Sequence, residues 1–238
     1  MAVFNITIIS DTVCPFCYLG RARLGRAIDL YRKTVPGGPS STFNIRWHAY
    51  RLDLSPPAES VLVTDVAAKK FGADRLLSKR ARMAQLGSQE GFNFTFSGRI
   101  GNTRDSHRLI QLGRARGPDM EDRVAMAVMR MFFEHGGDIC GWGDLSRAVE
   151  QLGISPAETQ EWLQGNGGAD QVDQEVREAY AKGFKGVPTF IINDKYEVDG
   201  AADVSDFLGR LVEAAGERDD VDVPVSSSSI CRVEGCAL

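Results

Sequence analysis

The stretch Asp11-Thr-Val-Cys-Pro-Phe-Cys17 decides the fold, because it joins a predicted strand to a predicted helix. Residues 5–9 before it (Asn-Ile-Thr-Ile-Ile) are rich in β-branched side chains and predict a strand. After it, Leu24 and Tyr31 continue an apolar face that begins at Cys17 and repeats at helical spacing. Two cysteines separated by two residues therefore stand at a strand-to-helix junction, which is typical of redox chemistry.

Outward from this junction, the predicted elements form an α/β layer whose two parts are far apart in the sequence. Residues 43–50 alternate apolar and polar side chains and predict a second strand, so the chain opens as a β-α-β unit. Near the other end, residues 188–193 predict a buried strand and residues 195–198 a short partner strand. Residues 203–217 predict a final helix with Asp203 as its N-cap.

The intervening region, residues 55–183, has almost no strand signal and predicts helices broken by glycines. The clearest segments are residues 103–116, 119–135, 144–152, 155–163 and 169–182. Asp119 and Ser155 are the expected N-caps of the second and fourth of these. The second helix is crowded with Met and Phe, which predicts a buried core, with an apolar groove beside Cys14 as the alternative.

The cysteine pair itself predicts which thiol attacks. Pro15 suits the first helical position, which makes Cys14 the N-cap residue. A thiolate there faces the free N–H groups of Phe16 and Cys17 and the positive end of the helix dipole, so the pKa of Cys14 should be lowered. Cys17, one turn further along, is expected to be more buried and to act as the resolving thiol. The carboxylate of Asp11 works against this, because a nearby negative charge raises a thiol pKa.

Two other interpretations of the pair stay open at this point. Cys14 and Cys17 could be small buried core residues, or they could form half of a zinc site, which needs two more ligands. The chain has five cysteines and three histidines, and the others show no matching paired spacing outside the C-terminal tail. No metal site is therefore predicted.

Composition argues against several classes of function. The formal net charge is −4 and no long Lys/Arg run occurs, so nucleic acid is not an expected partner. No stretch approaches the ~20 apolar residues of a membrane span, so no membrane partner is expected. Asn5 and Thr7 interrupt the apolar N-terminal run, which predicts a strand and not a signal peptide. We therefore expect a cytoplasmic protein, in which structural disulfides are rare.

On its motifs the sequence resembles the DsbA-like family that includes FrnE. More distantly it resembles 2-hydroxychromene-2-carboxylate isomerases and kappa-class glutathione transferases. The motifs extend over roughly residues 5–215, nearly all of the chain before the tail. They are Cys14-Pro-Phe-Cys-Tyr-Leu-Gly20, Trp47 with Tyr50-Arg-Leu52, Asn102-Thr103 with His107-Arg108-Leu109, Asp138-Ile139, Gly186-Val187-Pro188, and Val198 with Gly200-Ala201.

The resemblance implies a thioredoxin fold with an inserted all-helical domain. Residues 1–54 and 184–217 would together form the thioredoxin-like domain, and residues 55–183 would form the helical insertion. Residues 218–238 are acidic and Ser-rich, which predicts a disordered tail.

The resemblance also implies a cis Val187–Pro188 bond facing the cysteines, so the predicted catalytic residues are Cys14, Cys17 and Pro188. The backbone of Val187 would pair with a bound peptide or with glutathione. The predicted substrate- or glutathione-binding residues are Val187, Gly200, Ala201, Asp203, Phe16, Asn102 and His107. For His107 a packed or capping role is the alternative, and for Asn102 a helix cap or a loop contact.

Three departures from the family pattern bear on the activity. FrnE-like proteins more often have Trp at the position of Phe16 and Gln at the position of Ala202. The isomerase and transferase branches have Ser at the position of Cys14, so the present cysteine favours disulfide exchange.

The leading hypothesis is a thiol–disulfide oxidoreductase that acts through a mixed disulfide. The rival is a glutathione-dependent isomerase or transferase acting on a small aromatic or polyketide-like molecule, and a third is a binding module with a vestigial motif. No tightly bound cofactor is expected, and glutathione is considered as a co-substrate. The expected partner is a thiol or disulfide substrate, either protein or small molecule. The oligomeric state stays open, and a dimer is compatible with the sequence.

The tail carries a second cysteine pair, Cys231 and Cys236, separated by four residues that include a glycine. Such spacing permits a disulfide. One hypothesis is that this pair exchanges disulfides with Cys14–Cys17, and the other is that its thiols stay reduced and take no part.

Overall fold

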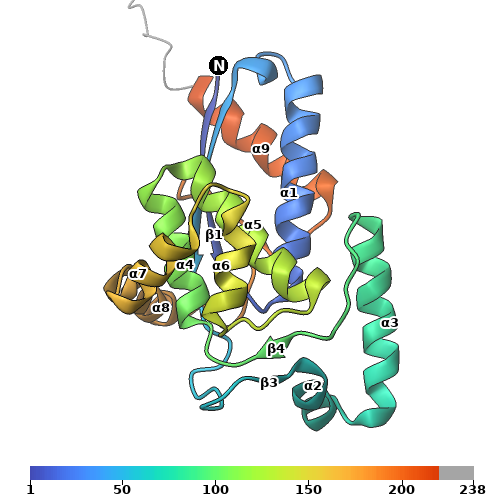
Figure 1. The fold of residues 1–238 in the computed structure, drawn as a ribbon. Helices are drawn as coiled ribbons and strands as arrows, with labels where there is room; N and C mark the ends of the chain where they lie inside the picture. The colour runs from blue at the N-terminus through green and yellow to red at the C-terminus, as the bar shows by residue number, and fades with distance from the viewer. Residues whose placement is uncertain (220–238) are drawn as a thin grey trace, which may run out of the picture.

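The computed structural model describes residues 1–219, apart from the side chains of residues 71, 73, 74 and 217–219. Its centre is a four-stranded sheet with the order β2-β1-β5-β6 (Figure 1). β1 runs parallel to β2 and antiparallel to β5, and β5 is antiparallel to β6. The strands are β1 (Val3–Ser10), β2 (Thr42–Ala49), β5 (Thr189–Ile192) and β6 (Tyr196–Asp199).

Two helices cover one face of this sheet: α1 (Pro15–Thr34) and α9 (Val204–Asp219) (Figure 1). Alternate side chains of β1 point toward them and are fully buried, as period-2 strands require. Phe4 meets Tyr31 of α1 edge-on with ring centroids 5.2 Å apart, and Phe190 of β5 meets Phe207 of α9 at 4.8 Å. These contacts hold α1, and with it the cysteine pair, at the end of β1.

The long segment between β2 and β5 is helical, as predicted. Four of the five predicted helices match the observed bounds within one residue at both ends, and the one predicted at 144–152 is observed two residues earlier at both ends. Its helices are α2 (Val63–Phe71), α3 (Ala73–Gln89), α4 (Arg104–Ala115), α5 (Pro118–His135), α6 (Trp142–Glu150), α7 (Pro156–Gln164) and α8 (Ala169–Ala181). The fold is therefore the predicted α/β thioredoxin-like fold with a helical insertion. In Figure 1, α4–α8 gather together while α2 and α3 lie apart from them.

Two details of the insertion differ from the prediction. It also holds a two-stranded sheet, in which β3 (Val61–Leu62) pairs with β4 (Arg99–Ile100), and strands of two residues leave no periodicity to detect. Asp119 does not cap α5, because Pro118 occupies the first helical position and Gly117 is the N-cap. Ser155 does cap α7, with its Oγ accepting the Glu158 N–H at 3.2 Å.

The Met- and Phe-rich helix α5 is core, as its composition predicts. Met129 is fully buried, and Met131, Phe132 and Phe133 are nearly so. Met120 and Met126 are partly buried against the same core. Within residues 1–219, no helix is both long and apolar enough to cross a lipid bilayer.

The predicted domain boundaries fall in loops, after β2 and after α8, and the division into two domains stays a prediction. Helix α9 continues to Asp219, two residues past its predicted end. The Cys231–Cys236 pair lies outside the described residues.

Candidate active site

Cys14 and Cys17 occupy the first turn of α1, in the predicted arrangement. Cys14 is the N-cap with extended backbone angles (φ −89°, ψ 111°), and Pro15 follows at the first helical position. The Cys14 N–H donates to Asp11 O at 3.0 Å, and the Cys17 N–H donates to Cys14 O at 3.0 Å. This turn directs both thiols to the end of β1, and both are free.

The exposure of the two thiols differs less than the sequence suggests. Cys17 is fully buried, as expected, but Cys14 is also only 4% exposed, so Cys14 is not the accessible thiol that an N-cap position suggests. The reason is tertiary: the Cys14 Sγ lies against the carbonyl of Val187, 3.5 Å away, on a segment 173 residues further along the chain. Phe16, by contrast, is 45% exposed beside it.

The pKa of Cys14 is lowered from its ordinary value. A hydrogen bond from the Cys17 thiol is the main cause, and the backbone N–H groups of Cys17 and Phe16 add to it. Burial and the negative charge of Asp11 oppose this lowering. The prediction from the N-cap position is thus confirmed, with the neighbouring thiol as the larger contribution.

The pKa of Cys17 moves the other way and is raised well above its ordinary value. Burial is the main cause, followed by the hydrogen bond with Cys14 and the charge of Cys14. The hydroxyl of Ser10 and the N–H of Asp11 partly offset this rise. The two thiols therefore have opposite tendencies: Cys14 to be the thiolate and Cys17 to keep its proton.

The Val187–Pro188 bond is cis and the segment faces Cys14, as the family resemblance implies. Gly200 holds this segment in place, because its N–H donates to Pro188 O at 2.8 Å. Gly200 has a φ of 70°, which favours glycine. The structure therefore brings together the three predicted catalytic residues Cys14, Cys17 and Pro188 with Val187 and Gly200.

The predicted binding residues Ala201 and Asp203 lie beside an arginine that the sequence did not single out as their partner. Arg23 Nη1 donates to Ala201 O at 2.7 Å and to Asp203 Oδ1 at 3.2 Å. Its Nε donates to the buried carboxylate of Glu90 at 2.8 Å. Asp203 itself is 78% exposed on its side chain. Arg23 stands nine residues after Cys14, and no local pattern predicts its contact with the α9 N-terminus.

Asn102 and His107 separate in the structure. Asn102 is exposed and its Oδ1 accepts the Arg104 N–H at 3.0 Å, a loop contact just before α4, whose N-cap residue is Thr103 and not Asn102. His107 is 4% exposed, with its Nε2 3.1 Å from Tyr50 O and 3.4 Å from Asp11 Oδ1. His107 is thus packed, and it lies against the segment that precedes the cysteines.

A groove of about 820 Å³ adjoins the cis segment. Lys182, Phe184 and Lys185 line it before Val187, and β6 contributes Glu197 and Asp199. It therefore offers apolar and charged contacts of both signs next to Val187 and Pro188.

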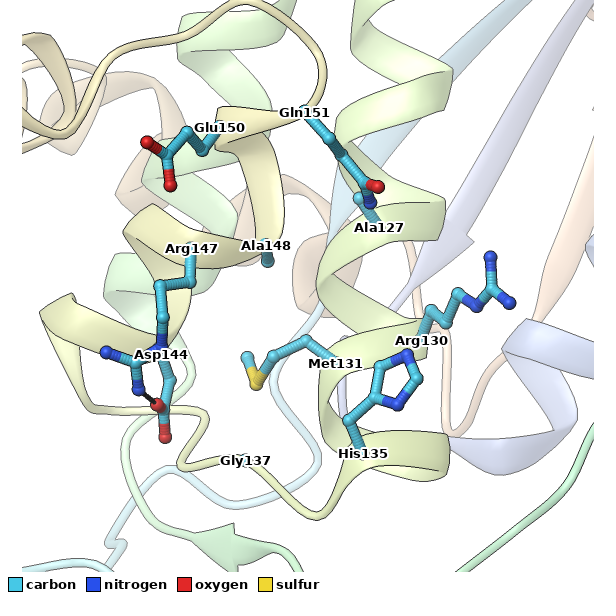
Figure 2. A pocket seen from close by; sticks show the side chains of 10 residues that line it. All are labelled: Ala127, Arg130, Met131, His135, Gly137, Asp144, Arg147, Ala148, Glu150 and Gln151. Atoms are coloured by element: carbon cyan, nitrogen blue, oxygen red, sulfur yellow. Dashed lines mark hydrogen bonds and ion pairs between the residues drawn. The ribbon is translucent and has the colours of Figure 1, made fainter.

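A second hollow, of about 730 Å³, lies between α5 and α6 (Figure 2). None of the predicted site residues line it. Figure 2 shows Arg147 paired with Asp144 and Arg130 turned away from the hollow. In the part of the chain that the structure describes, no three His, Cys, Asp or Glu side chains gather as a metal site would require.

Comparisons with solved structures agree on the fold. A probable DsbA oxidoreductase from Streptomyces coelicolor superimposes with a TM-score of 0.77, at 24% identity over 99% of each chain. A 2-hydroxychromene-2-carboxylate isomerase gives 0.61, at 18% identity over 92% of this chain and 98% of that one. The cytosolic disulfide reductase DsbM from Pseudomonas aeruginosa, in its structure with GSH, gives 0.54, at 16% identity over 91% and 98%.

At these identities the likeness shows the fold alone. No curated protein matches the sequence. The family model of the DSBA-like thioredoxin domain matches residues 5–212 of this chain. These residues include the cysteine pair, the whole helical insertion and the cis segment. The chain therefore belongs to the DSBA-like thioredoxin domain family.

Proposed function

We propose that the protein is a thiol–disulfide oxidoreductase of the FrnE type that works in the cytoplasm through a mixed disulfide. The observation that carries this proposal is the place of Cys14 and Cys17 in the first turn of α1, with Cys14 Sγ 3.5 Å from the Val187 carbonyl before the cis bond. The lowered pKa of Cys14 and the raised pKa of Cys17 support it. A thiolate is the nucleophile in disulfide exchange, so Cys14 makes the first attack, and Cys17 gives up its proton only when it resolves the intermediate.

In the oxidising direction, a substrate thiolate attacks Cys14 Sγ of the Cys14–Cys17 disulfide. The S–S bond breaks, its electron pair passes to Cys17 Sγ, and Cys17 takes up a proton. A second substrate thiolate then attacks the substrate sulfur of the mixed disulfide. The Cys14 thiolate leaves, its charge stabilised by the helix N–H groups, and the substrate disulfide is released.

In the reducing direction, the Cys14 thiolate attacks a substrate disulfide and expels one substrate thiolate. Cys17 then loses its proton and attacks Cys14 Sγ, which expels the second substrate thiolate and restores the Cys14–Cys17 disulfide. Which direction prevails depends on the reduction potential of the pair against that of the compartment.

We further propose that the substrate backbone pairs with Val187 and that glutathione can occupy this position. The γ-glutamyl carboxylate would lie at residues 200–203, before α9, where helix N-termini favour anions. The N–H groups of Ala201 and Ala202 would bind it, because the Gly200 N–H donates to Pro188 O and the Asp203 N–H donates to Asp206 Oδ2. The exposed Asp203 carboxylate would hold the γ-glutamyl ammonium. The related fold of a disulfide reductase described with GSH supports this choice of thiol.

The rival hypothesis is a glutathione-dependent isomerase or transferase, because the 2-hydroxychromene-2-carboxylate isomerase has a similar fold. The presence of two thiols of opposite tendency favours disulfide exchange, because isomerisation assisted by glutathione has no need of a resolving cysteine. The two hypotheses differ in which cysteine substitution abolishes activity.

The test compares wild type with Cys14→Ser and Cys17→Ser, and uses Cys140→Ser as the matched control. Each variant is assayed for insulin reduction and for glutathione-dependent turnover of an aromatic substrate. We expect Cys14→Ser to lower insulin reduction to the uncatalysed rate, and Cys17→Ser to accumulate a mixed disulfide that mass spectrometry detects. Cys140→Ser should match wild type. Full insulin reduction by Cys14→Ser, or turnover of the aromatic substrate alone, would overturn the proposal.

A further inference from the structure

The segment that precedes the cysteines carries a buried carboxylate that is only half paired. Asp11 is 1% exposed, and its Oδ2 accepts the Leu52 N–H at 2.8 Å. Its Oδ1 accepts no hydrogen bond from the residues that the structure describes. A buried carboxylate oxygen without a donor is costly, so such an atom calls for an explanation.

The side chain that forms an ion-pair contact with this oxygen is the imidazole of His107, which belongs to the helical insertion. His107 Nε2 lies 3.4 Å from Asp11 Oδ1 and 3.1 Å from Tyr50 O. Both neighbours are acceptors, so Nε2 carries its hydrogen whether the ring is neutral or charged. A second proton would therefore add to Nδ1 and turn the contact into an ion pair with Asp11.

Among the groups around His107, Asp11 is the one that forms an ion-pair contact with its ring. Tyr50 faces it through its carbonyl, and the Tyr50 hydroxyl has a pKa raised to about 12 by burial. Tyr180 of α8 stacks on Tyr50 and donates to Arg51 O. The charge of Arg51 contributes to the lowered pKa of Asp173, whose main partner is Arg104. Arg108 is bound to Asp105 and to carbonyls of residues 162, 163 and 167.

The carboxylate of Asp11 acts on the reacting sulfur. Its negative charge opposes the thiolate of Cys14, as the pKa of that thiol reflects. The Thr12 and Ser106 hydroxyls, 2.7 Å apart, hold the same segment against the first turn of α4. Any charge that His107 gains would therefore be felt at Cys14 through a fixed carboxylate.

We propose that His107 and Asp11 are positioning residues through which the helical insertion sets the reduction potential of the Cys14–Cys17 pair. The inference rests on the proposed function, since it concerns the same two thiols. When two glutathione thiols reduce the disulfide, the products are the Cys14 thiolate, the Cys17 thiol, glutathione disulfide and one proton. A charged His107 neutralises Asp11, favours the thiolate and so makes the pair a stronger oxidant.

The experiment measures two properties that need no turnover: the equilibrium of the pair with a glutathione redox buffer, and the absorbance titration of the Cys14 thiolate. The variants are Asp11→Asn, His107→Gln and the double variant. His48→Gln is the matched control, because His48 Nε2 contacts a backbone carbonyl, Glu175 O at 2.9 Å, and is not paired with Asp11. Glutamine keeps an N–H donor for Tyr50 O but cannot gain a proton.

Asp11→Asn should lower the Cys14 pKa and shift the equilibrium toward the dithiol by about tenfold for each pKa unit. His107→Gln should shift it toward the disulfide by about threefold, as half a pKa unit requires. This second difference should vanish in the Asp11→Asn background. His48→Gln should match wild type at every pH.

Equal equilibrium constants for wild type and His107→Gln would overturn the inference, as would an equal effect of His107→Gln with and without Asp11. Should Asp11→Asn fail to fold, the comparison of His107→Gln with His48→Gln still decides. A wild-type pair that does not exchange with glutathione or protein disulfides at all would instead refute the proposed function.

Discussion

The helical insertion contacts the sheet with buried charge in two places, and the two contacts are built differently. At the free edge of β2, Glu121 Oε1 accepts the Trp47 N–H and Glu175 Oε2 accepts the Ala49 N–H, both at 2.8 Å. Arg114 of α4 joins the two carboxylates, with its Nη2 2.8 Å from Glu121 and its Nη1 2.6 Å from Glu175. A permanent positive charge thus compensates the buried acids.

At the other end of the same helix, His107 Nε2 lies 3.4 Å from Asp11 Oδ1, and an imidazole, unlike a guanidinium, has both a neutral and a charged form. The guanidinium closes the β2 edge against further strand pairing and keeps its charge at any physiological pH. The imidazole leaves a carboxylate oxygen without a hydrogen bond beside the reacting thiols. Helix α4 thus contributes to stability through the fixed charge of Arg114, and in our proposal it contributes to the thiol chemistry through His107.

The largest expected effect breaks the first contact. Arg114→Met removes the cation that joins two buried carboxylates and leaves Glu121 only the exposed Arg46, 3.8 Å away. The free energy of unfolding should fall by about 3–5 kcal/mol. Urea denaturation measures the loss. Arg116→Met is the matched control, since Arg116 pairs with Glu158 in a part-exposed position, and should cost about 1 kcal/mol or less. Equal losses for the two variants would contradict a special role of Arg114.

The second prediction compares the oxidised and the reduced protein as pH changes. The lowered pKa of Cys14 stabilises the reduced form increasingly as pH rises from its folded-state pKa toward 9.0, and this gain is lost as pH falls. Above 9.0 the raised pKa of Cys17 acts in the opposite sense, because the thiol ionises more readily in the unfolded chain. The oxidised form has neither thiol.

The free energy of unfolding of the reduced form, relative to that of the oxidised form, should therefore rise from about pH 6 to about pH 9 by about 1.4 kcal/mol for each unit by which the Cys14 pKa is lowered. It should fall again toward about pH 10. Urea denaturation of both forms measures the difference. Cys140 is a thiol in both forms, so its contribution cancels. Asp11→Asn should extend this slope to lower pH, whereas Arg114→Met should leave it unchanged. A reduced form whose stability relative to the oxidised form is flat below pH 9 would refute the prediction.

The smallest effect concerns the hydroxyl pair that fixes the second contact. Thr12→Val removes the 2.7 Å hydrogen bond between Thr12 Oγ1 and Ser106 Oγ, while Ser106 still donates to Thr103 O at 2.7 Å. We expect a loss of about 1 kcal/mol in unfolding free energy and a changed response of the Cys14 pKa to His107→Gln. Ser155→Ala, which removes the α7 cap at a similar cost of about 1 kcal/mol, should leave that response as it is in wild type. If both variants behave alike in the thiol titration, the hydroxyl pair has no part in the coupling.

Local patterns in the sequence were enough for the reacting pair and for most of the helices. Cys14 as N-cap, Pro15 at the first helical position and Ser155 as the α7 cap are each set by hydrogen bonds and backbone angles within a few residues. The β-α-β opening follows from side-chain periodicity, which strands and helices impose on their own residues. The cis Val187–Pro188 bond could be predicted from the family resemblance, but not from the dipeptide itself.

The rest depends on contacts between segments far apart in the chain, which leave no periodic trace in either segment. Cys14 is buried because Val187, 173 residues away, lies against it. His107 reaches Asp11, and Arg23 reaches Ala201, only because the sheet brings β1, the insertion and α9 to one end of the molecule. Local physics thus places the thiols on the helix, whereas long-range packing sets the charges and the burial that control their reactivity.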